Sequence, residues 1–313
     1  MQYRRLGRSG LQVSAIGLGS QLTFGTRLDF EATRRCVAAA VDAGINLFDT
    51  ADGYGDGEAE RLLGRALAEH RRAGWAVATE CFFPRSEHPS DRGLSRKHVV
   101  ESVHGSLRRL RVDHIDLMQC HRFDPETPLE ETIGALDDLV RQGKVLYWGV
   151  GRCSPGQLGA YAGTAQRMGA RAPVSHQTLY NLLHREIEAE ILPAAERAGI
   201  GTIGYAPLAA GVLSGKYAGG AIPGASRAAA GELRAGMYDL TPDKVEIATR
   251  VGEIAAEAGL KPATLALAWC LRDPRVACVL AGASRLEQIA DNAAAAAITL
   301  DAGIVRRLDE ATA

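Results

Sequence analysis

The feature that most constrains the fold of this chain is an alternation of short apolar runs with longer amphipathic stretches. Runs of strand character lie at residues 15–18, 46–49, 76–79, 115–119, 146–150, 173–177, 201–205 and 276–281. Helical periodicity marks stretches between them, among them 30–43, 58–69, 96–109, 129–142 and 242–258. A strand, a helix and a further strand form a parallel crossover unit. Eight such units in 313 residues predict an α/β protein with a closed (β/α)8 barrel rather than an open doubly wound sheet.

Signals at the ends of these stretches agree with that fold. Glycines such as Gly44, Gly143 and Gly199 follow helical stretches, as helix C-terminal caps do. Residues 2–13 predict a hairpin that closes the bottom of the barrel, and helices are expected at the C-terminus. No boundary or repeat is visible, so residues 1–313 are predicted to form one domain. The segment 206–240 is rich in Gly and Ala and lacks periodicity, which is typical of a functional covering loop.

The composition excludes several classes of protein. A formal net charge of −1 and 46% hydrophobic residues predict a globular protein without a nucleic-acid partner. The first residues lack the apolar core of a signal peptide, and no apolar run has the length of a membrane span, so no membrane partner is expected. The six cysteines are scattered, which favours a reduced, cytoplasmic setting. No Cys/His cluster has the spacing of a metal site, so none is expected.

Ionisable side chains gather at the predicted carboxyl ends of neighbouring strands. Asp49, Glu80 and His121 end or follow the second, third and fourth strands, and Tyr54 lies in the loop after the second. Catalytic groups of a (β/α)8 barrel collect at this face, because all strands end there. Any one of these residues alone would be read as a structural residue. Together they predict a catalytic, or formerly catalytic, site.

Several motifs around these residues resemble those of aldo-keto reductases. The motifs are 49–55 (DTADGYG), 93–97 (GLSRK), 112–117 (VDHIDL), 143–149 (GKVLYWG), 180–183 (YNLL), 207–217 (PLAAGVLSGKY) and 282–284 (GAS). The resemblance covers residues 4–309 and is closest to the branch that contains potassium-channel β subunits and related bacterial reductases. It implies NADPH-dependent reduction of a carbonyl. In the family, the tyrosine matching Tyr54 supplies the proton, the histidine matching His121 orients the carbonyl, and the aspartate matching Asp49 is coupled to a lysine.

The resemblance also implies an NADP-binding surface. Arg152 or Ser154 and Gln177 match positions near the nicotinamide amide, and Tyr205 matches the aromatic residue that stacks on its ring. Arg285 offers a guanidinium to a 2′-phosphate, which favours NADP over NAD. For Tyr205 the alternative is a core aromatic residue, and for Arg285 a solvated arginine. The other residues assigned to the cofactor are Gly19, Ser20, Pro207, Leu208, Ala209, Gly211, Lys216, Arg227, Gly282, Ser284, Gln288 and Asn292.

Glu80 occupies the place of the family's lysine. A carboxylate there removes the counter-ion of Asp49 and is expected to raise the pKa of Tyr54, because negative charges disfavour tyrosinate. Three hypotheses follow: weakened carbonyl reduction with the cofactor still bound, a different proton donor or base (Glu80 or a protonated His121), or a largely non-catalytic nucleotide-binding protein. An alternative is that Glu80 points out of the site and pairs with Arg122 or Lys144.

These observations favour an NADP(H)-dependent oxidoreductase acting on an aldehyde, ketone or keto-sugar. The alternatives are a cofactor-binding sensor or partner subunit and, more distantly, a metal- or phosphate-dependent lyase or isomerase. The absence of an N-terminal extension argues against binding to a channel, and relatives imply a homo-oligomer, a tetramer or octamer. Candidate substrate contacts lie in the barrel-mouth loops: Phe24, Phe82, Phe83, Phe123 and Tyr238 as apolar walls, and Arg85, Arg122 and Asp124 as polar groups.

Overall fold

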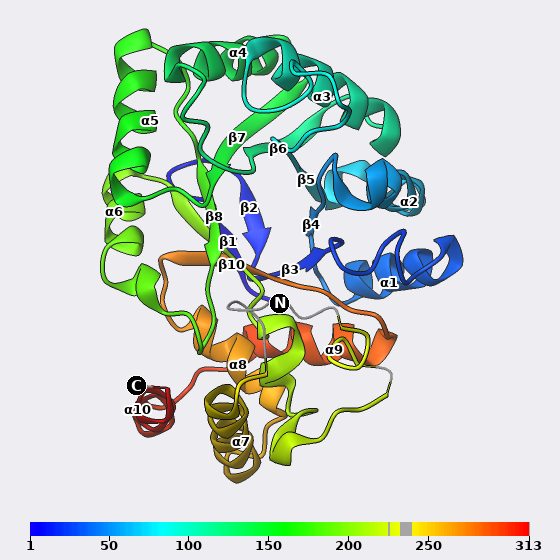
Figure 1. Ribbon diagram of the computed structural model, residues 1–313, viewed down its shortest axis with the longest axis vertical. Helices are drawn as coiled ribbons and strands as arrows, with labels where there is room; N and C mark the ends of the chain where they lie inside the picture. The colour runs from blue at the N-terminus through cyan, green and yellow to red at the C-terminus, as the bar shows by residue number, and fades with distance from the viewer. Residues whose placement is uncertain (225, 232–239, 313) are drawn as a thin grey trace.

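Eight parallel strands close into a barrel in the computed structural model, which describes residues 1–224, 226–231 and 240–312 (Figure 1). Neighbouring strands follow chain order, and the last strand pairs with the first. The strands are β3 (Ile16–Gly19), β4 (Leu47–Asp49), β5 (Ala76–Cys81), β6 (Ile115–Cys120), β7 (Val145–Gly151), β8 (Ser175–Leu179), β9 (Gly201–Tyr205) and β10 (Val276–Ala281). The predicted (β/α)8 barrel is confirmed, and the predicted strand ends differ from the observed ones by at most two residues.

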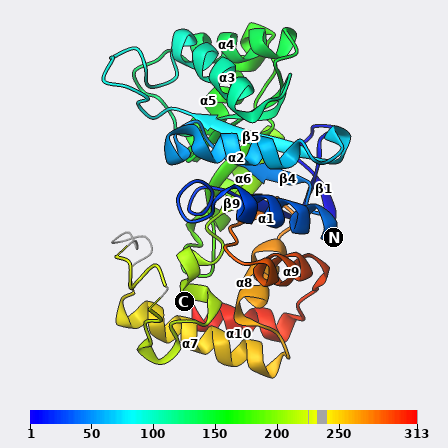
Figure 2. The ribbon, with the colours of Figure 1, turned by 90° about the vertical axis from the view of Figure 1, so that its right-hand side faces the viewer.

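Helices surround the barrel, and α7 to α10 gather together along one side of it (Figures 1 and 2). Local capping fixes several helix starts: Asp29 accepts a hydrogen bond of 2.9 Å from the amide of Ala32, and Ser95 caps the third helix. The helices are α1 (Phe30–Asp42), α2 (Glu58–Leu67), α3 (Arg96–Leu110), α4 (Leu129–Arg141), α5 (Pro155–Met168), α6 (Ile191–Ala198), α7 (Pro242–Glu257), α8 (Pro262–Leu271), α9 (Leu286–Ala294) and α10 (Ala302–Ala311).

An N-terminal hairpin closes the amino-terminal end of the barrel, as predicted. Strands β1 (Tyr3–Arg5) and β2 (Gln12–Ser14) pair antiparallel. The guanidinium of Arg4 donates to the carbonyl oxygens of Val276 (2.7 Å), at the beginning of β10, and of Leu271 (2.9 Å), five residues before it. Leu6 and Val13 are buried with apolar side chains of five barrel strands, so the hairpin seals the barrel interior. The opposite mouth is therefore the open one.

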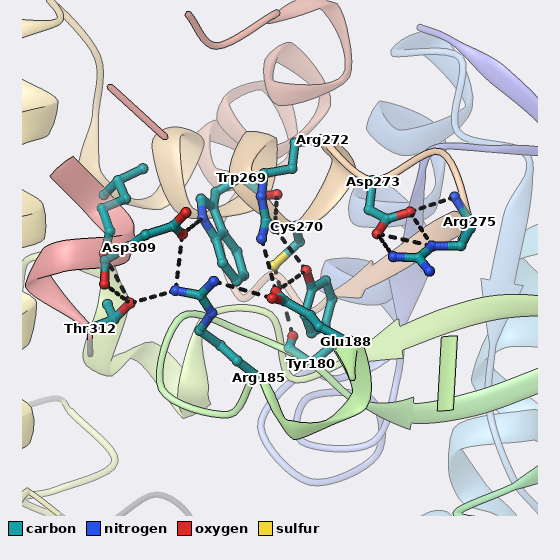
Figure 3. Close-up of polar contacts among 11 residues, drawn as sticks. Tyr180, Arg185, Glu188, Trp269, Cys270, Arg272, Asp273, Arg275, Asp309 and Thr312 are labelled. Atoms are coloured by element: carbon teal, nitrogen blue, oxygen red, sulfur yellow. Dashed lines mark hydrogen bonds and ion pairs between the residues drawn. The ribbon is translucent and has the colours of Figure 1, made fainter. Parts of the chain in front are cut away.

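A polar network fastens the C-terminal helices to the loop after β8 (Figure 3). Glu188 accepts hydrogen bonds from the hydroxyl of Tyr180 (2.8 Å) and from Arg272 (2.9 Å), and also pairs with Arg185. Arg185 reaches Asp309 on α10 at 2.9 Å. The guanidinium of Arg185 also lies 5.0 Å from the ring centroid of Trp269 on α8, so this arginine connects α8 to α10 by stacking and charge together.

No single helix among residues 1–224, 226–231 and 240–312 is long and apolar enough to cross a membrane. The pair α7 and α8 reaches that length only across a bend of 93°. The side chains of α8 are buried from Thr264 to Leu271. This apolar helix therefore serves as part of the protein core.

Candidate active site

The open mouth brings together the four ionisable residues singled out in the sequence. Asp49 ends β4, Glu80 lies in β5, and His121 follows β6, so parallel pairing places all three at one edge of the barrel. Tyr54 begins a short 3-10 turn after β4, and its ring lies 6.1 Å from the His121 ring, nearly perpendicular to it. Asp49, Glu80 and His121 are buried, whereas Tyr54 is half-buried.

Glu80 faces the site and pairs with His121. Its Oε2 lies 2.8 Å from Nδ1 of His121, and its side chain is only 2% exposed. Its other oxygen accepts a weaker hydrogen bond of 3.4 Å from the amide of Gln119. The alternative pairing with Lys144 is wrong, because Nζ of Lys144 lies 2.8 Å from Nε2 of His104 instead.

Burial and the second carboxylate together change the protonation of the site. The pKa of the Asp49 carboxyl is raised well above its ordinary value, first by burial and then by Glu80, although a hydrogen bond from Gln177 (2.9 Å) acts the other way. The pKa of Tyr54 is also raised, by burial first and then by Glu80 and Asp49. The expected effect of Glu80 on Tyr54 is therefore present, and the Tyr54 hydroxyl stays neutral over the ordinary pH range.

A cavity of about 670 Å³ leads from this mouth toward α9. Asp49, Tyr54 and His121 line its inner end, and Ser284 and Arg285 line its far end. Of the residues assigned to the cofactor, the lining also includes Gly19, Arg152, Gln177, Tyr205, Pro207, Leu208, Gly211, Lys216, Arg227, Gly282 and Gln288.

Four residues assigned to the cofactor do not line this cavity. Ser154 instead caps α5, where its hydroxyl accepts a hydrogen bond from the amide of Gln157. Ala209 and Asn292 are buried and are not among the residues that line the cavity. Ser20 is 1% exposed, and its hydroxyl has no hydrogen-bond partner among the described residues. Their roles at a cofactor stay predictions.

Residues 15–313 match the sequence model of the aldo/keto reductase family. The chain belongs to this family. Probable voltage-gated potassium channel subunits beta of Oryza sativa subsp. japonica and Arabidopsis thaliana are each 40% identical over 296 residues, which cover 93% of this chain and 90% of theirs. A putative voltage-gated potassium channel subunit beta of Schizosaccharomyces pombe is 38% identical over 321 residues, 98% of this chain and 92% of its own. The family resemblance read from the motifs is confirmed.

Three cations meet on the cavity wall of this aldo/keto reductase. Lys216, Arg227 and Arg27 all line the cavity, although they lie far apart in the chain. The pKa of Lys216 is lowered, first by burial and then by these two arginines, while Tyr217 acts in the opposite direction. Like charges placed so close together create a local positive potential that an anion would relieve. Arg27 was missed in the sequence, because the loop after β3 carries no periodic signal.

The backbone beside these cations is strained. Ala206, Ala209 and Ala210 have positive φ angles of 52°, 46° and 55°, a region that residues other than glycine rarely adopt. Gly211 has a φ of 101°, and a Cβ there would come 2.5 Å from Nζ of Lys216. Strain of this kind persists where the surrounding structure imposes it, commonly at ligand sites. The covering segment 206–240 thus begins with a strained turn, and its residues 225 and 232–239 lie outside the described part.

The candidate substrate contacts divide into two groups. Phe83 lies at the mouth, with its ring 4.8 Å from His121 and the Arg122 guanidinium 5.0 Å from its centroid. Phe24 is a buried core residue, and Phe123 packs on Tyr161. Asp124 accepts hydrogen bonds from backbone amides of Leu94 and Glu126, and Arg85 pairs with Asp56 at 2.6 Å, so both brace loops. Phe82 packs edge-on against Phe83, and Tyr238 lies outside the described residues.

Proposed function

We propose that this chain is an NADP(H)-dependent oxidoreductase that interconverts an alcohol with an aldehyde, ketone or keto-sugar. The observation that supports this function best is that one continuous cavity joins Tyr54 and His121 to the cluster of Lys216, Arg227 and Arg27 and continues to Arg285. Its volume, about 670 Å³, is in the usual range of small-molecule and cofactor sites. A dinucleotide carries its reactive ring and its phosphates at separate points, which matches this arrangement of groups.

The residues of the cavity fit NADP(H). Lys216, Arg227 and Arg27 suit a pyrophosphate, and Arg285 suits a 2′-phosphate, because guanidinium groups bind phosphate oxygens in pairs. Gln177 donates its Nε2 to Asp49, which leaves its Oε1 free to accept a hydrogen bond from a carboxamide. Bound NADP(H) would supply or accept a hydride.

Two side chains, those of Arg152 and Gln288, occupy positions that a bound cofactor would need. The guanidinium of Arg152 lies 4.9 Å from the ring centroid of Tyr205, so this arginine would move if an aromatic ring stacked on that face. The Oε1 of Gln288 accepts hydrogen bonds from the backbone amides of Ser284 (2.8 Å) and Arg285 (3.2 Å). This side chain covers the start of α9, and a phosphate bound there would compete with it.

The substrate oxygen would be held between Tyr54 and His121, whose rings form one wall of the mouth. The neutral Tyr54 hydroxyl can donate a hydrogen bond to that oxygen. Phe83 offers an exposed apolar edge beside His121. These groups position a small carbonyl or alcohol.

Calorimetric titration with NADPH and NADH tests the cofactor, and NADP(H)-linked absorbance with a panel of carbonyls and alcohols tests the activity. We expect NADPH to bind more tightly than NADH, and a subset of substrates to turn over. Failure to bind either nucleotide would refute the proposed function.

A second candidate is a cofactor-binding partner subunit with little turnover. It is favoured by the names of the relatives, which are potassium channel subunits beta, and by the carboxylate of Glu80 beside Tyr54. Tight NADPH binding without turnover of any substrate would support it. A cytoplasmic location and assembly into a tetramer or octamer belong to the same proposal, and light scattering of the purified protein would test the assembly.

A further inference from the structure

The Glu80–His121 pair determines which nitrogen of the imidazole meets the cavity. A carboxylate only accepts hydrogen bonds, so the contact of 2.8 Å places a proton on Nδ1 of His121. Nε2 is then the nitrogen left for a ligand, and His121 lines the cavity. In the absence of an added proton, Nε2 is an acceptor.

Neighbouring side chains hold the Glu80–His121 pair in place on both sides. The amide of Gln119 reaches Glu80 at 3.4 Å, and Gln119 is itself fixed by the hydroxyl of Ser175 (3.0 Å). All three side chains are buried. The ring of Phe83 packs edge-on at 4.8 Å against His121. A histidine oriented by a buried carboxylate has the geometry of a general base, because the carboxylate stabilises the imidazolium that forms.

Tyr54 lacks the corresponding support. Among the described residues, no hydrogen bond joins its hydroxyl to Asp49, Glu80 or His121, and burial first, then Glu80 and Asp49, raises the pKa of this hydroxyl. It can donate a hydrogen bond to a substrate oxygen, but it releases its proton poorly.

We propose that Nε2 of His121 exchanges the proton with the substrate oxygen, and that Glu80 is the positioning residue that makes this possible. The inference rests on the proposed oxidoreductase function. In the oxidative direction, the alcohol proton moves to Nε2 while the carbinol carbon gives its hydride to an oxidised nicotinamide. The products are a carbonyl, the reduced nicotinamide and an imidazolium paired with Glu80. In the reductive direction each transfer is reversed.

Nuclear magnetic resonance of the protein labelled with ¹⁵N-histidine tests the pair without any cofactor. His121 is assigned by the signal lost in His121→Gln. We expect the neutral ring to carry its proton on Nδ1 in the wild type and in Glu80→Gln, which keeps an acceptor oxygen, and to lose this preference in Glu80→Met. Asp116→Asn, which removes a buried carboxylate at the other end of β6, is the matched control and leaves the tautomer unchanged. A proton on Nε2 in the wild type would overturn the proposal.

Steady-state kinetics then test the role in turnover. We expect His121→Gln to lower kcat by about 10²- to 10⁴-fold, the usual contribution of a general acid or base, and Tyr54→Phe to lower it less than about tenfold while raising KM. The loss of kcat in Glu80→Gln should fall between these two losses, because glutamine keeps the orientation of His121 but lacks the negative charge of glutamate. A larger loss of kcat in Tyr54→Phe than in His121→Gln would overturn the proposal. Wild-type protein that binds NADPH without turnover would refute the oxidoreductase function. The NMR measurement of the His121 tautomer needs no cofactor, so it tests the Glu80–His121 pair independently of that function.

Discussion

Oε2 of Glu80 lies 2.8 Å from Nδ1 of His121, and His121 in turn lines a cavity that Lys216, Arg227 and Arg27 also line. This contact joins β5 to the loop after β6, and it exists because parallel pairing sets Glu80 opposite Gln119, two residues before His121. A lysine at this position would repel a protonated His121 and would pair with a neighbouring carboxylate instead. A carboxylate at residue 80 thus supports the side chain of His121, whereas a lysine there would support a carboxylate.

Replacing Glu80 with lysine should transfer proton exchange to Tyr54. The positive charge beside Asp49 would lower the pKa of the Tyr54 hydroxyl, since an opposite charge favours tyrosinate. We expect NADPH consumption with carbonyl substrates to rise by at least about tenfold in Glu80→Lys, within the range that general acid catalysis supplies. Tyr54→Phe should then lower NADPH consumption by a larger factor in the Glu80→Lys background than in the wild type. A lysine variant no more active than the wild type would show that Glu80 does not limit carbonyl reduction.

The eight strands and the four mouth residues could be predicted because both depend on local pattern. Short apolar runs give strand ends, and strand ends of a barrel share one face. The Glu80–His121 pair could not be predicted, because the direction of Glu80 depends on packing around β5. Arg27 could not be predicted either, because only the folded conformation of the loop after β3 brings it to Lys216 and Arg227 on the cavity wall. Ser154 was assigned from its position in a motif, whereas a helix start immediately after it uses its hydroxyl as a cap.

Removing the guanidinium of Arg285 should weaken the binding of NADPH much more than the binding of NADH. Arg285 is exposed at the far end of the cavity, where a 2′-phosphate would need a cation. A hydrogen bond to a charged group contributes roughly 1.5–3 kcal/mol, so the NADPH dissociation constant in Arg285→Ala should rise by about 10- to 100-fold. The NADH constant should change less than about threefold, because no 2′-phosphate is lost. Arg306→Ala, on the exposed face of α10, is the control, and equal weakening of both cofactors would contradict the assignment.

The stability of the protein should fall as pH rises through the titration of Asp52. Burial raises the pKa of this carboxyl from 3.8 to about 6, although the hydroxyl of Ser102 donates to it at 2.9 Å. The folded state therefore binds more protons than the unfolded state between these values, so the free energy of unfolding decreases from about pH 4 to about pH 6. The penalty above this range is of the order of 3 kcal/mol at most, at about 1.4 kcal/mol for each pKa unit.

Urea unfolding of the wild type and Asp52→Asn between pH 4 and pH 7.5 tests this expectation. Asparagine keeps an oxygen that accepts from Ser102 and cannot ionise. We expect the variant to lack this decrease and to be about 1–3 kcal/mol more stable than the wild type at pH 7. Parallel stability curves for the two proteins would show that Asp52 does not titrate in this range.

Two glycines in helices should respond to alanine in opposite directions. A Cβ at Gly64 in α2 would lie 2.2 Å from the carbonyl oxygen of Leu110 in α3, a backbone atom that cannot move without separating the two helices. Overpacking of this kind costs about 1–3 kcal/mol, so Gly64→Ala should destabilise the protein by at least that amount. A Cβ at Gly252 in α7 meets no atom within 4 Å among the described residues. Gly252→Ala should therefore stabilise the protein by roughly 0.5–1 kcal/mol, because alanine loses less backbone entropy on folding. Chemical unfolding of both variants measures the difference, and a tolerated alanine at Gly64 would mean that α2 and α3 approach less closely than the structure places them.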